Sequence, residues 1–163
     1  MRAGHREEKR ISHSEAETVR IGEEFGEAYL RAGTVVCVRG ELGAGKTHFI
    51  KGIACALGID ERELTSPTFA LANEFELAGE DARSTQSSSP TRLYHLDCFR
   101  FEKPEELLEL GVEDYLYPKN AATIIEWPER IASLIPADAI QVEIRVISES
   151  VREINWAMIR NPD

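Results

Sequence analysis

The feature that most constrains this chain is a glycine-rich segment that runs Gly40-Glu41-Leu42-Gly43-Ala44-Gly45-Lys46-Thr47. It matches in full the phosphate-binding pattern G-x-x-x-x-G-K-[ST] of P-loop proteins. The apolar run 35–38 precedes it and predicts a buried parallel strand. Apolar residues at helical spacing follow it as far as Leu57. The segment therefore joins a strand to a helix, which is the context that a P-loop requires.

Each fixed position of that pattern has a physical task. The glycines let the backbone bend so that successive N–H groups point at phosphate oxygens, and the N-terminal dipole of the following helix adds to this field. Lys46 supplies a positive charge to the β- and γ-phosphates, and the hydroxyl of Thr47 is a ligand for Mg²⁺. The sequence therefore predicts a nucleotide site that also holds magnesium.

A P-loop needs a second carboxylate for its metal, at the end of a neighbouring strand. Asp97 follows the strand-like run 93–96, and Glu126 follows the run 123–125. Ligands of open α/β sheets bind where parallel strands end. The residues alone leave both acids open as candidates, since a strand-end acid can also be an exposed loop residue.

The remaining pattern predicts an α/β fold with a mostly parallel central sheet flanked by helices and a C-terminal antiparallel hairpin. Ser14 and Glu17 form a capping box that starts a helix. The chain has 163 residues, which fits a single domain over 14–163, and we expect residues 1–13 to be a mobile N-terminal tail. The other predicted elements are strands at 69–77 and 93–96 joined by a surface loop at 79–90, a helix at 104–110, a strand at 122–125, and the hairpin at 140–147 and 152–157.

Composition restricts the function classes. The net charge of -10 disfavours unaided binding to a nucleic-acid backbone. The three cysteines form no CxxC pair, and the histidines show no metal-ligand spacing. No signal peptide and no apolar run of membrane-spanning length is present, so we expect a cytoplasmic protein without a membrane partner.

Four blocks of the sequence together resemble the TsaE family, formerly called YjeE. The P-loop is the first block, and the others are Ser66-Pro67-Thr68-Phe69, Tyr94-His95-Leu96-Asp97-Cys98-Phe99-Arg100 and Ile125-Glu126-Trp127-Pro128-Glu129-Arg130. The resemblance extends from about residue 14 to about residue 156. It implies a bacterial Mg²⁺-dependent ATPase that is needed for N6-threonylcarbamoyladenosine (t6A) at position 37 of certain tRNAs. It also implies the partners TsaB and TsaD, with tRNA reached only through their complex.

The resemblance implies roles for individual residues. Asp97 acts in ATP hydrolysis together with Lys46, and Thr68 lies in a segment that behaves as a nucleotide-sensing switch. Thr47 and Glu126 hold Mg²⁺, and Trp127 is the aromatic beside that acid. The start of the first helix, with Glu15 and Thr18, closes over the nucleotide. The residues implied to bind ATP or ADP are Glu15, Leu42, Gly43, Ala44, Gly45, Lys46, Thr47, His48 and Trp127.

The sequence departs from the family pattern at several positions. His48 stands where the family usually has a threonine or serine whose hydroxyl reaches the α-phosphate. Phe99 stands where the family usually has a tyrosine, and the loop at 79–90 is longer than usual. Arg152 resembles an arginine near the final hairpin of the family.

Three other functions remain as alternatives. A small-molecule kinase needs an arginine-rich lid, which no loop provides, and a GTP-dependent switch needs the guanine motif Asn-Lys-x-Asp, which does not occur. A nucleotide-bound scaffold differs from an ATPase only in turnover. Arg100 and Arg130 fit an arginine finger, a solvated arginine or a surface ion pair. His95 fits a packed or hydrogen-bonded strand histidine.

Overall fold

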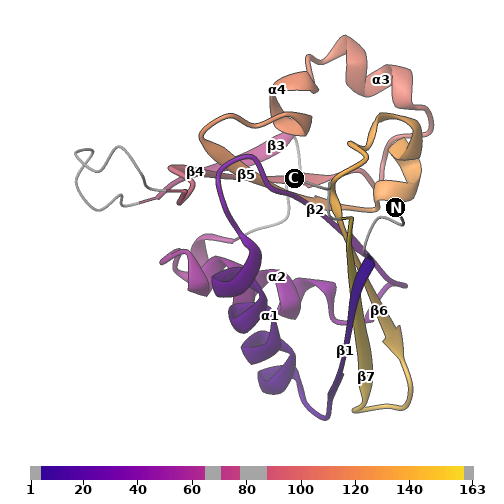
Figure 1. Cartoon of the computed structure of the whole chain (residues 1–163). Helices are drawn as coiled ribbons and strands as arrows, with labels where there is room; N and C mark the ends of the chain where they lie inside the picture. Colours follow the sequence, from indigo (N-terminus) through magenta and orange to yellow (C-terminus); the bar gives the residue numbers. More distant parts are fainter. Residues whose placement is uncertain (1–4, 65–70, 78–87, 160–163) are drawn as a thin grey trace.

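The computed structural model describes residues 5–64, 71–77 and 88–159, and it contains a seven-stranded sheet with the order β1-β7-β6-β2-β5-β4-β3 (Figure 1). The strands are β1 (His5–Ser12), β2 (Val35–Arg39), β3 (Ala72–Glu76), β4 (Arg92–Asp97), β5 (Ala121–Glu126), β6 (Ile140–Val146) and β7 (Arg152–Ile159). The helices are α1 (Glu15–Tyr29), α2 (Lys46–Ala56), α3 (Pro104–Glu109) and α4 (Glu113–Leu116), with short 3-10 turns η1 (Glu61–Glu63) and η2 (Pro128–Leu134).

The centre of the sheet is parallel and its flanks are antiparallel. Strand β2 pairs in parallel with β6 and β5, and β5 pairs in parallel with β4. Strands β6, β7 and β1 continue the sheet on one side as an antiparallel wing, and β3 closes the other side. This arrangement confirms the predicted α/β fold, in which β6 and β7 are the predicted C-terminal hairpin.

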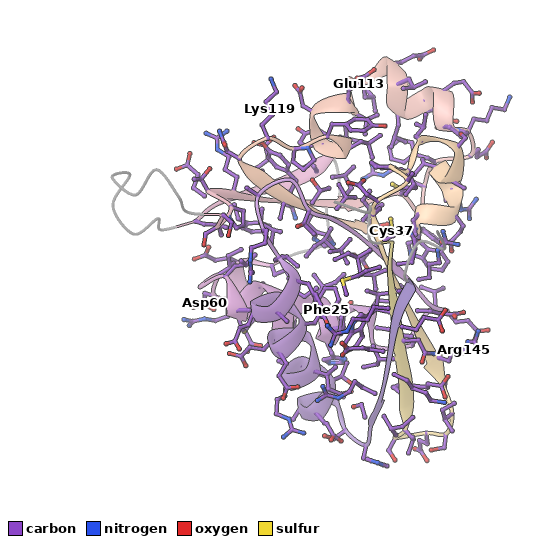
Figure 2. The ribbon with its side chains drawn as sticks, viewed as in Figure 1. Phe25, Cys37, Asp60, Glu113, Lys119 and Arg145 are labelled. Atoms are coloured by element: carbon purple, nitrogen blue, oxygen red, sulfur yellow. The ribbon has the colours of Figure 1, made fainter. Side chains whose placement is uncertain are left out.

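Both faces of the central strands are buried, which explains why β2 is apolar at consecutive positions. Val36 and Val38 pack into a core beneath α1 and α2, whereas Val35 and Cys37 pack into a second core on the opposite face. Figure 1 shows α1 and α2 on one side of the sheet and α3 and α4 on the other. In Figure 2, Phe25 points from α1 into the first core.

Helices α1 and α2 approach each other closely because glycines face the contact. A β-carbon on Gly22 would collide with the carbonyl of Phe49, and one on Gly52 would collide with the carbonyl of Val19. This contact fixes the position of α2, and with it the P-loop that precedes α2.

The start of α1 has the predicted cap. The Ser14 side chain accepts a hydrogen bond of 3.0 Å from the Glu17 backbone N–H, and the Glu17 carboxylate accepts one of 2.7 Å from the His13 N–H. The first bond is the N-cap bond of the predicted capping box, whereas the second reaches the N–H of His13, one residue before the cap, instead of that of Ser14.

The prediction of a mobile tail over 1–13 is wrong for residues 5–12, which form the edge strand β1. Strand β1 pairs with β7 along its whole length. Glu8 accepts a hydrogen bond of 2.7 Å from the Tyr29 hydroxyl, and Arg10 forms an ion pair of 2.6 Å with Glu24. A charged segment is typical of an edge strand as well as of a tail. Here the pairing with β7 and the polar contacts with α1 hold the segment as a strand.

Strands β3 and β4 pair antiparallel, as expected of two strands joined by a loop. Strand β3 begins at Ala72, and residues 65–70 lie outside the described residues, as do residues 78–87 of the predicted loop.

Candidate functional site

The P-loop connects β2 to α2 and is shaped by its glycines. Gly43 and Gly45 adopt left-handed backbone angles, with φ of 76° and 102°. A β-carbon on Gly40 would lie 2.8 Å from the carbonyl oxygen of Ile144, so a larger residue would displace the loop from β6. Helix α2 begins at Lys46, so the N–H groups of its first turn and its positive dipole end face the site.

Lys46 is almost completely buried at the base of this loop, with 7% of its surface exposed. Its ammonium group donates hydrogen bonds to the carbonyl oxygens of Gly40, at 2.5 Å, and Glu41, at 2.9 Å, and lies 4.4 Å from the centroid of the Trp127 ring. Burial lowers the pKa of Lys46, and the negative charge of Glu126 is the largest influence that opposes this shift. The cation is therefore held by two loop carbonyls and by an aromatic face.

The two candidate acids lie side by side at the ends of adjacent strands. Asp97 on β4 is the register partner of Glu126 on β5, and both strands run parallel to β2. Glu126 is buried and Asp97 is half-buried, with its carboxylate accepting a 3.0 Å hydrogen bond from the Phe99 N–H. Parallel pairing of β4 with β5 therefore brings the two strand-end acids together at one edge of the sheet.

Glu126 has a buried partner. The Nε2 atom of His95 lies 2.7 Å from Oε2 of Glu126, and His95 is 3% exposed. When Glu126 is ionised, its carboxylate accepts and the imidazole N–H donates. One carboxylate oxygen is thereby fixed, which orients the acid on the cleft wall. His95 is both packed and hydrogen-bonded, as expected of this strand histidine.

A cleft of about 530 Å³ joins the P-loop to these strand ends. Most residues that the sequence assigns to nucleotide or metal meet in it. The predicted residues that line the cleft are Glu15, Thr18, Leu42, Gly43, Gly45, Lys46, Thr47, His48, Asp97, Glu126 and Trp127. Ala44 is buried in the loop itself, and Thr68 lies outside the described residues.

Trp127 has the one positive φ, 55°, among the non-glycine residues that the structure describes. This costly conformation turns the chain directly after Glu126 and places the indole between Lys46 and Phe99. The ring centroids of Trp127 and Phe99 are 4.9 Å apart. The aromatic residue that follows the acid thus forms part of the cleft wall.

The first turn of α1 reaches the cleft from the other side. The His48 imidazole lies 3.5 Å from the carboxylate of Glu15, which is 83% exposed. The hydroxyl of Thr18 lies 2.7 Å from that of Ser12 at the end of β1, and both residues are buried. The helix start to which the family resemblance gives a role over the nucleotide thus lines the same cleft as the P-loop.

The hairpin between β6 and β7 adds residues that the sequence analysis did not assign to the cleft. These lining residues are Glu149, Ser150 and Arg152, and Ser14 at the start of α1 is a further lining residue that the sequence analysis did not assign. Arg152 donates a hydrogen bond of 3.0 Å from Nε to the carbonyl of Ala44, which lies 108 positions earlier in the chain. No local pattern in a sequence signals a contact over such a separation.

Arg100 lies in the turn that follows β4 and Arg130 lies in η2 after β5, and both are exposed. The Arg130 guanidinium lies 5.8 Å from the centroid of the Phe99 ring, which is also exposed.

The oxygen donors of the cleft suit magnesium in the presence of phosphate. Within the described residues, no group of three or more His, Cys, Asp or Glu side chains is arranged to hold a metal. Magnesium is commonly bound by one or two protein oxygens with substrate phosphates and water completing its shell. The Thr47 hydroxyl and the Glu126 carboxylate, which line one cleft, match this sparse donor set.

None of the described helices is long and apolar enough to cross a membrane.

Similarity to known proteins identifies the family. The model of the family "Threonylcarbamoyl adenosine biosynthesis protein TsaE" matches residues 12–154. The tRNA threonylcarbamoyladenosine biosynthesis protein TsaE of Treponema pallidum is 39% identical over 147 residues, which cover 90% of this chain and 98% of that protein. The TsaE protein of Bacillus subtilis is 32% identical over 134 residues, covering 82% and 75% of the two chains. The crystal structure of Bacillus subtilis YdiB superposes with a TM-score of 0.71 at 26% identity, covering 97% of this chain and 89% of that one. The chain therefore belongs to the TsaE family.

Proposed function

We propose that this protein is a Mg²⁺-dependent P-loop ATPase that acts in the t6A modification of tRNA. The observation that carries the proposal is the meeting of Lys46 and Thr47 with Asp97 and Glu126 in one cleft. A phosphate-binding loop next to paired strand-end acids is the arrangement that phosphoryl transfer from a nucleotide requires. ATP is favoured over GTP because the sequence lacks the guanine motif.

In this proposal, each group has a separate task. The N–H groups of the P-loop and Lys46 bind the phosphates, and Thr47 and Glu126 hold Mg²⁺. Bound magnesium would neutralise charge on the phosphate oxygens. Asp97, which is half-buried at the cleft, positions the attacking water, and Thr68 senses the γ-phosphate.

The nucleotide contacts in the proposal extend over both sides of the cleft. Leu42, Gly43, Ala44 and Gly45 form the loop around the phosphates. Glu15 and His48 face the nucleotide from the helix starts, and Trp127 from the strand end. These positions are supported by the lining of the cleft and by the packing of the loop.

The tRNA role and the partners rest on the family. The curated relatives are named for tRNA threonylcarbamoyladenosine biosynthesis. We propose that this chain acts in the cytoplasm with TsaB and TsaD, which perform the threonylcarbamoyl transfer, and that it reaches tRNA through their complex. The net charge of -10 supports this division of labour, because an acidic surface repels the phosphate backbone.

The acids give a direct test of the mechanism. We expect Asp97→Ala and Glu126→Ala each to lower the ATP turnover rate about 100-fold, while ADP affinity changes less, since phosphoryl transfer depends on positioning and charge stabilisation. Phosphate release, with and without TsaB and TsaD, measures turnover, and calorimetry measures affinity. Wild-type turnover in both variants would show that the assigned roles are wrong.

Lys46→Ala provides the matching test of binding. It removes the buried cation of the loop, so nucleotide affinity should fall about 100-fold through the loss of charge-assisted hydrogen bonds. Lys51→Ala on the same helix is the control and should bind as the wild type does. Tighter binding of GTP than of ATP by the wild-type protein would contradict the nucleotide assignment.

The partner proposal has its own experiment. Pull-down with TsaB and TsaD should recover the chain, with recovery that differs between samples with and without ATP. Absence of association in both states, together with nanomolar tRNA binding by the isolated chain at physiological salt, would overturn the proposed division of labour.

A further inference from the structure

Arg152 connects the C-terminal hairpin to the P-loop. It opens β7, directly after the turn that follows β6, and it lines the cleft. Its Nε donates to the carbonyl of Ala44 at 3.0 Å, and Nη2 donates to the carbonyl of Gly43 at 3.4 Å. One side chain of the hairpin therefore holds two consecutive carbonyls of the P-loop.

The third guanidinium nitrogen anchors the arginine to its own turn. Nη1 donates to the carbonyls of Ser148, at 2.8 Å, Val151, at 3.1 Å, and Glu149, at 3.2 Å. All three nitrogens thus donate to backbone carbonyls. A guanidinium oriented in this way differs from an arginine finger, which directs its donors at the transferred phosphoryl group.

Because the peptide bond is planar, this contact also fixes the direction of an N–H group in the phosphate-binding loop. The Ala44 carbonyl and the Gly45 N–H belong to one planar trans peptide, so they point in opposite directions. Holding the carbonyl therefore fixes the direction of that N–H. The loop needs such a restraint because Gly43 and Gly45, both at positive φ, leave it with more accessible conformations than other residues would.

We propose that Arg152 is a positioning residue that holds the P-loop in its phosphate-binding shape and couples it to the β6–β7 turn. The inference rests on the proposed function only in naming the ligand as a nucleotide. The turn residues Glu149 and Ser150 line the same cleft. The P-loop and the β6–β7 turn, which Arg152 connects, therefore form one wall of the cleft.

Backbone amide hydrogen exchange of the nucleotide-free protein tests the restraint itself. We expect Arg152→Gln and Arg152→Lys both to raise exchange in peptides that cover residues 41–48, with little change in peptides from α3. Lysine keeps the positive charge but lacks the planar fork of donors, so it cannot hold two carbonyls and a turn at once. Arg145→Gln is the matched control: Arg145 lies on the same hairpin, exposed and ion-paired with Glu143 at 2.9 Å, on the side of the wing away from α1 (Figure 2).

Calorimetric ADP binding provides the second readout. Both Arg152 variants should bind ADP about tenfold more weakly than the wild type, whereas Arg145→Gln should retain wild-type affinity. Circular dichroism and thermal unfolding identify folded variants, and Arg152→Lys, the milder change, keeps the test usable if Arg152→Gln does not fold. Unfolding of both variants would also contradict the proposal, because it would make Arg152 a requirement for the whole fold.

The outcomes separate this inference from the proposed function. Wild-type exchange at 41–48 in Arg152→Lys, or loss of exchange protection without loss of ADP affinity, would overturn the positioning role. Wild-type affinity in Arg152→Lys but not in Arg152→Gln would show that charge acts instead of geometry. Failure of the wild-type protein to bind ATP or ADP would refute the proposed function and leave the exchange result standing.

Discussion

The charged side chains of the cleft differ in depth. Lys46 and Glu126 are each 7% exposed, Asp97 is half-buried, and the Glu15 side chain is 83% exposed. Buried charges need partners, which Lys46 finds in loop carbonyls and Glu126 finds in His95. The deep groups are therefore fixed by the fold, and the shallow acids are freer to respond to a ligand.

The His95–Glu126 contact makes a prediction for stability. His95→Leu leaves a buried carboxylate without its donor and should lower the free energy of unfolding by about 3 kcal/mol. His95→Gln supplies an amide N–H and should lose about half as much or less. Urea denaturation measures both.

Asn155→Ala is a suitable control for that series, because Asn155 is half-buried on the wing and bonds Glu153 at 2.9 Å. A loss in His95→Leu no larger than the loss in this control would mean that the contact with Glu126 contributes little to stability.

Residues within the P-loop were predictable because they lie at fixed intervals in one short continuous segment of the chain. Asp97 and Glu126 were predictable because parallel strand ends share an edge of the sheet. The contact of Arg152 with the loop was not, since nothing local in the sequence links positions 108 residues apart. The partnership of His95 with Glu126 needs the register of β4 against β5, which no single segment specifies.

At the scale of elements, α2 is positioned by its contact with α1 rather than by the P-loop alone. Both helices place glycines at the crossing. Such close contact leaves no room for an added methyl group, and interiors this dense do not absorb one without displacement.

Gly52→Ala tests this contact. In the middle of an exposed helix, alanine instead of glycine stabilises by up to about 1 kcal/mol. Here the new β-carbon would also lie 2.7 Å from the Glu23 backbone nitrogen, so we expect a net loss of about 1 to 3 kcal/mol in the free energy of unfolding. Urea denaturation measures it, with Lys51→Ala on the same helix as control.

A neutral or stabilising Gly52→Ala would contradict the close-packed crossing. Weaker ADP binding in the same variant would agree with a shift of α2, because the helix begins at Lys46.

The N-terminal strand β1 is an element that the sequence analysis did not predict. The segment 5–12 is rich in charge and lacks an apolar face, so its composition resembles a tail. It is held instead by β7 and by polar contacts to α1, such as the 2.7 Å hydrogen bond between Glu8 and Tyr29. A strand stabilised by its neighbours leaves little signal in its own residues.

At the scale of the whole molecule, one of the two cores contains thiols that resist ionisation. Burial raises the pKa of the Cys37 thiol to about 11 and that of Cys98 to about 12. Both lie in the core beneath α3 and η2, where Figure 2 shows Cys37 deep inside the molecule. These free thiols behave as small apolar side chains at neutral pH.

Raised thiol pKa values make stability depend on alkaline pH. Below the unfolded-state pKa near 9 both states keep the proton; above it the unfolded thiol ionises while the folded one does not. The free energy of unfolding should therefore fall between pH 9 and about pH 11, by about 2 to 3 kcal/mol for Cys37. Urea denaturation at pH 8 and at pH 10.5 measures this loss.

Cys37→Ala should reduce that pH dependence, whereas Cys55→Ala should leave most of it, because Cys55 is only half-buried. An identical pH dependence in the wild type and in Cys37→Ala would contradict the assignment to the buried thiol.

The location of the two tryptophans has an optical consequence. Trp156 is 4% exposed in the core, with its ring centroid 5.4 Å from that of Phe25, while Trp127 lies beside the Lys46 ammonium on the cleft wall. Their fluorescence should therefore separate into a blue-shifted emission from the interior and a cation-influenced emission from the cleft. Any ligand that draws Lys46 away from the indole changes only the second of these. The chain thus carries an internal reference chromophore together with a reporter of its own occupancy.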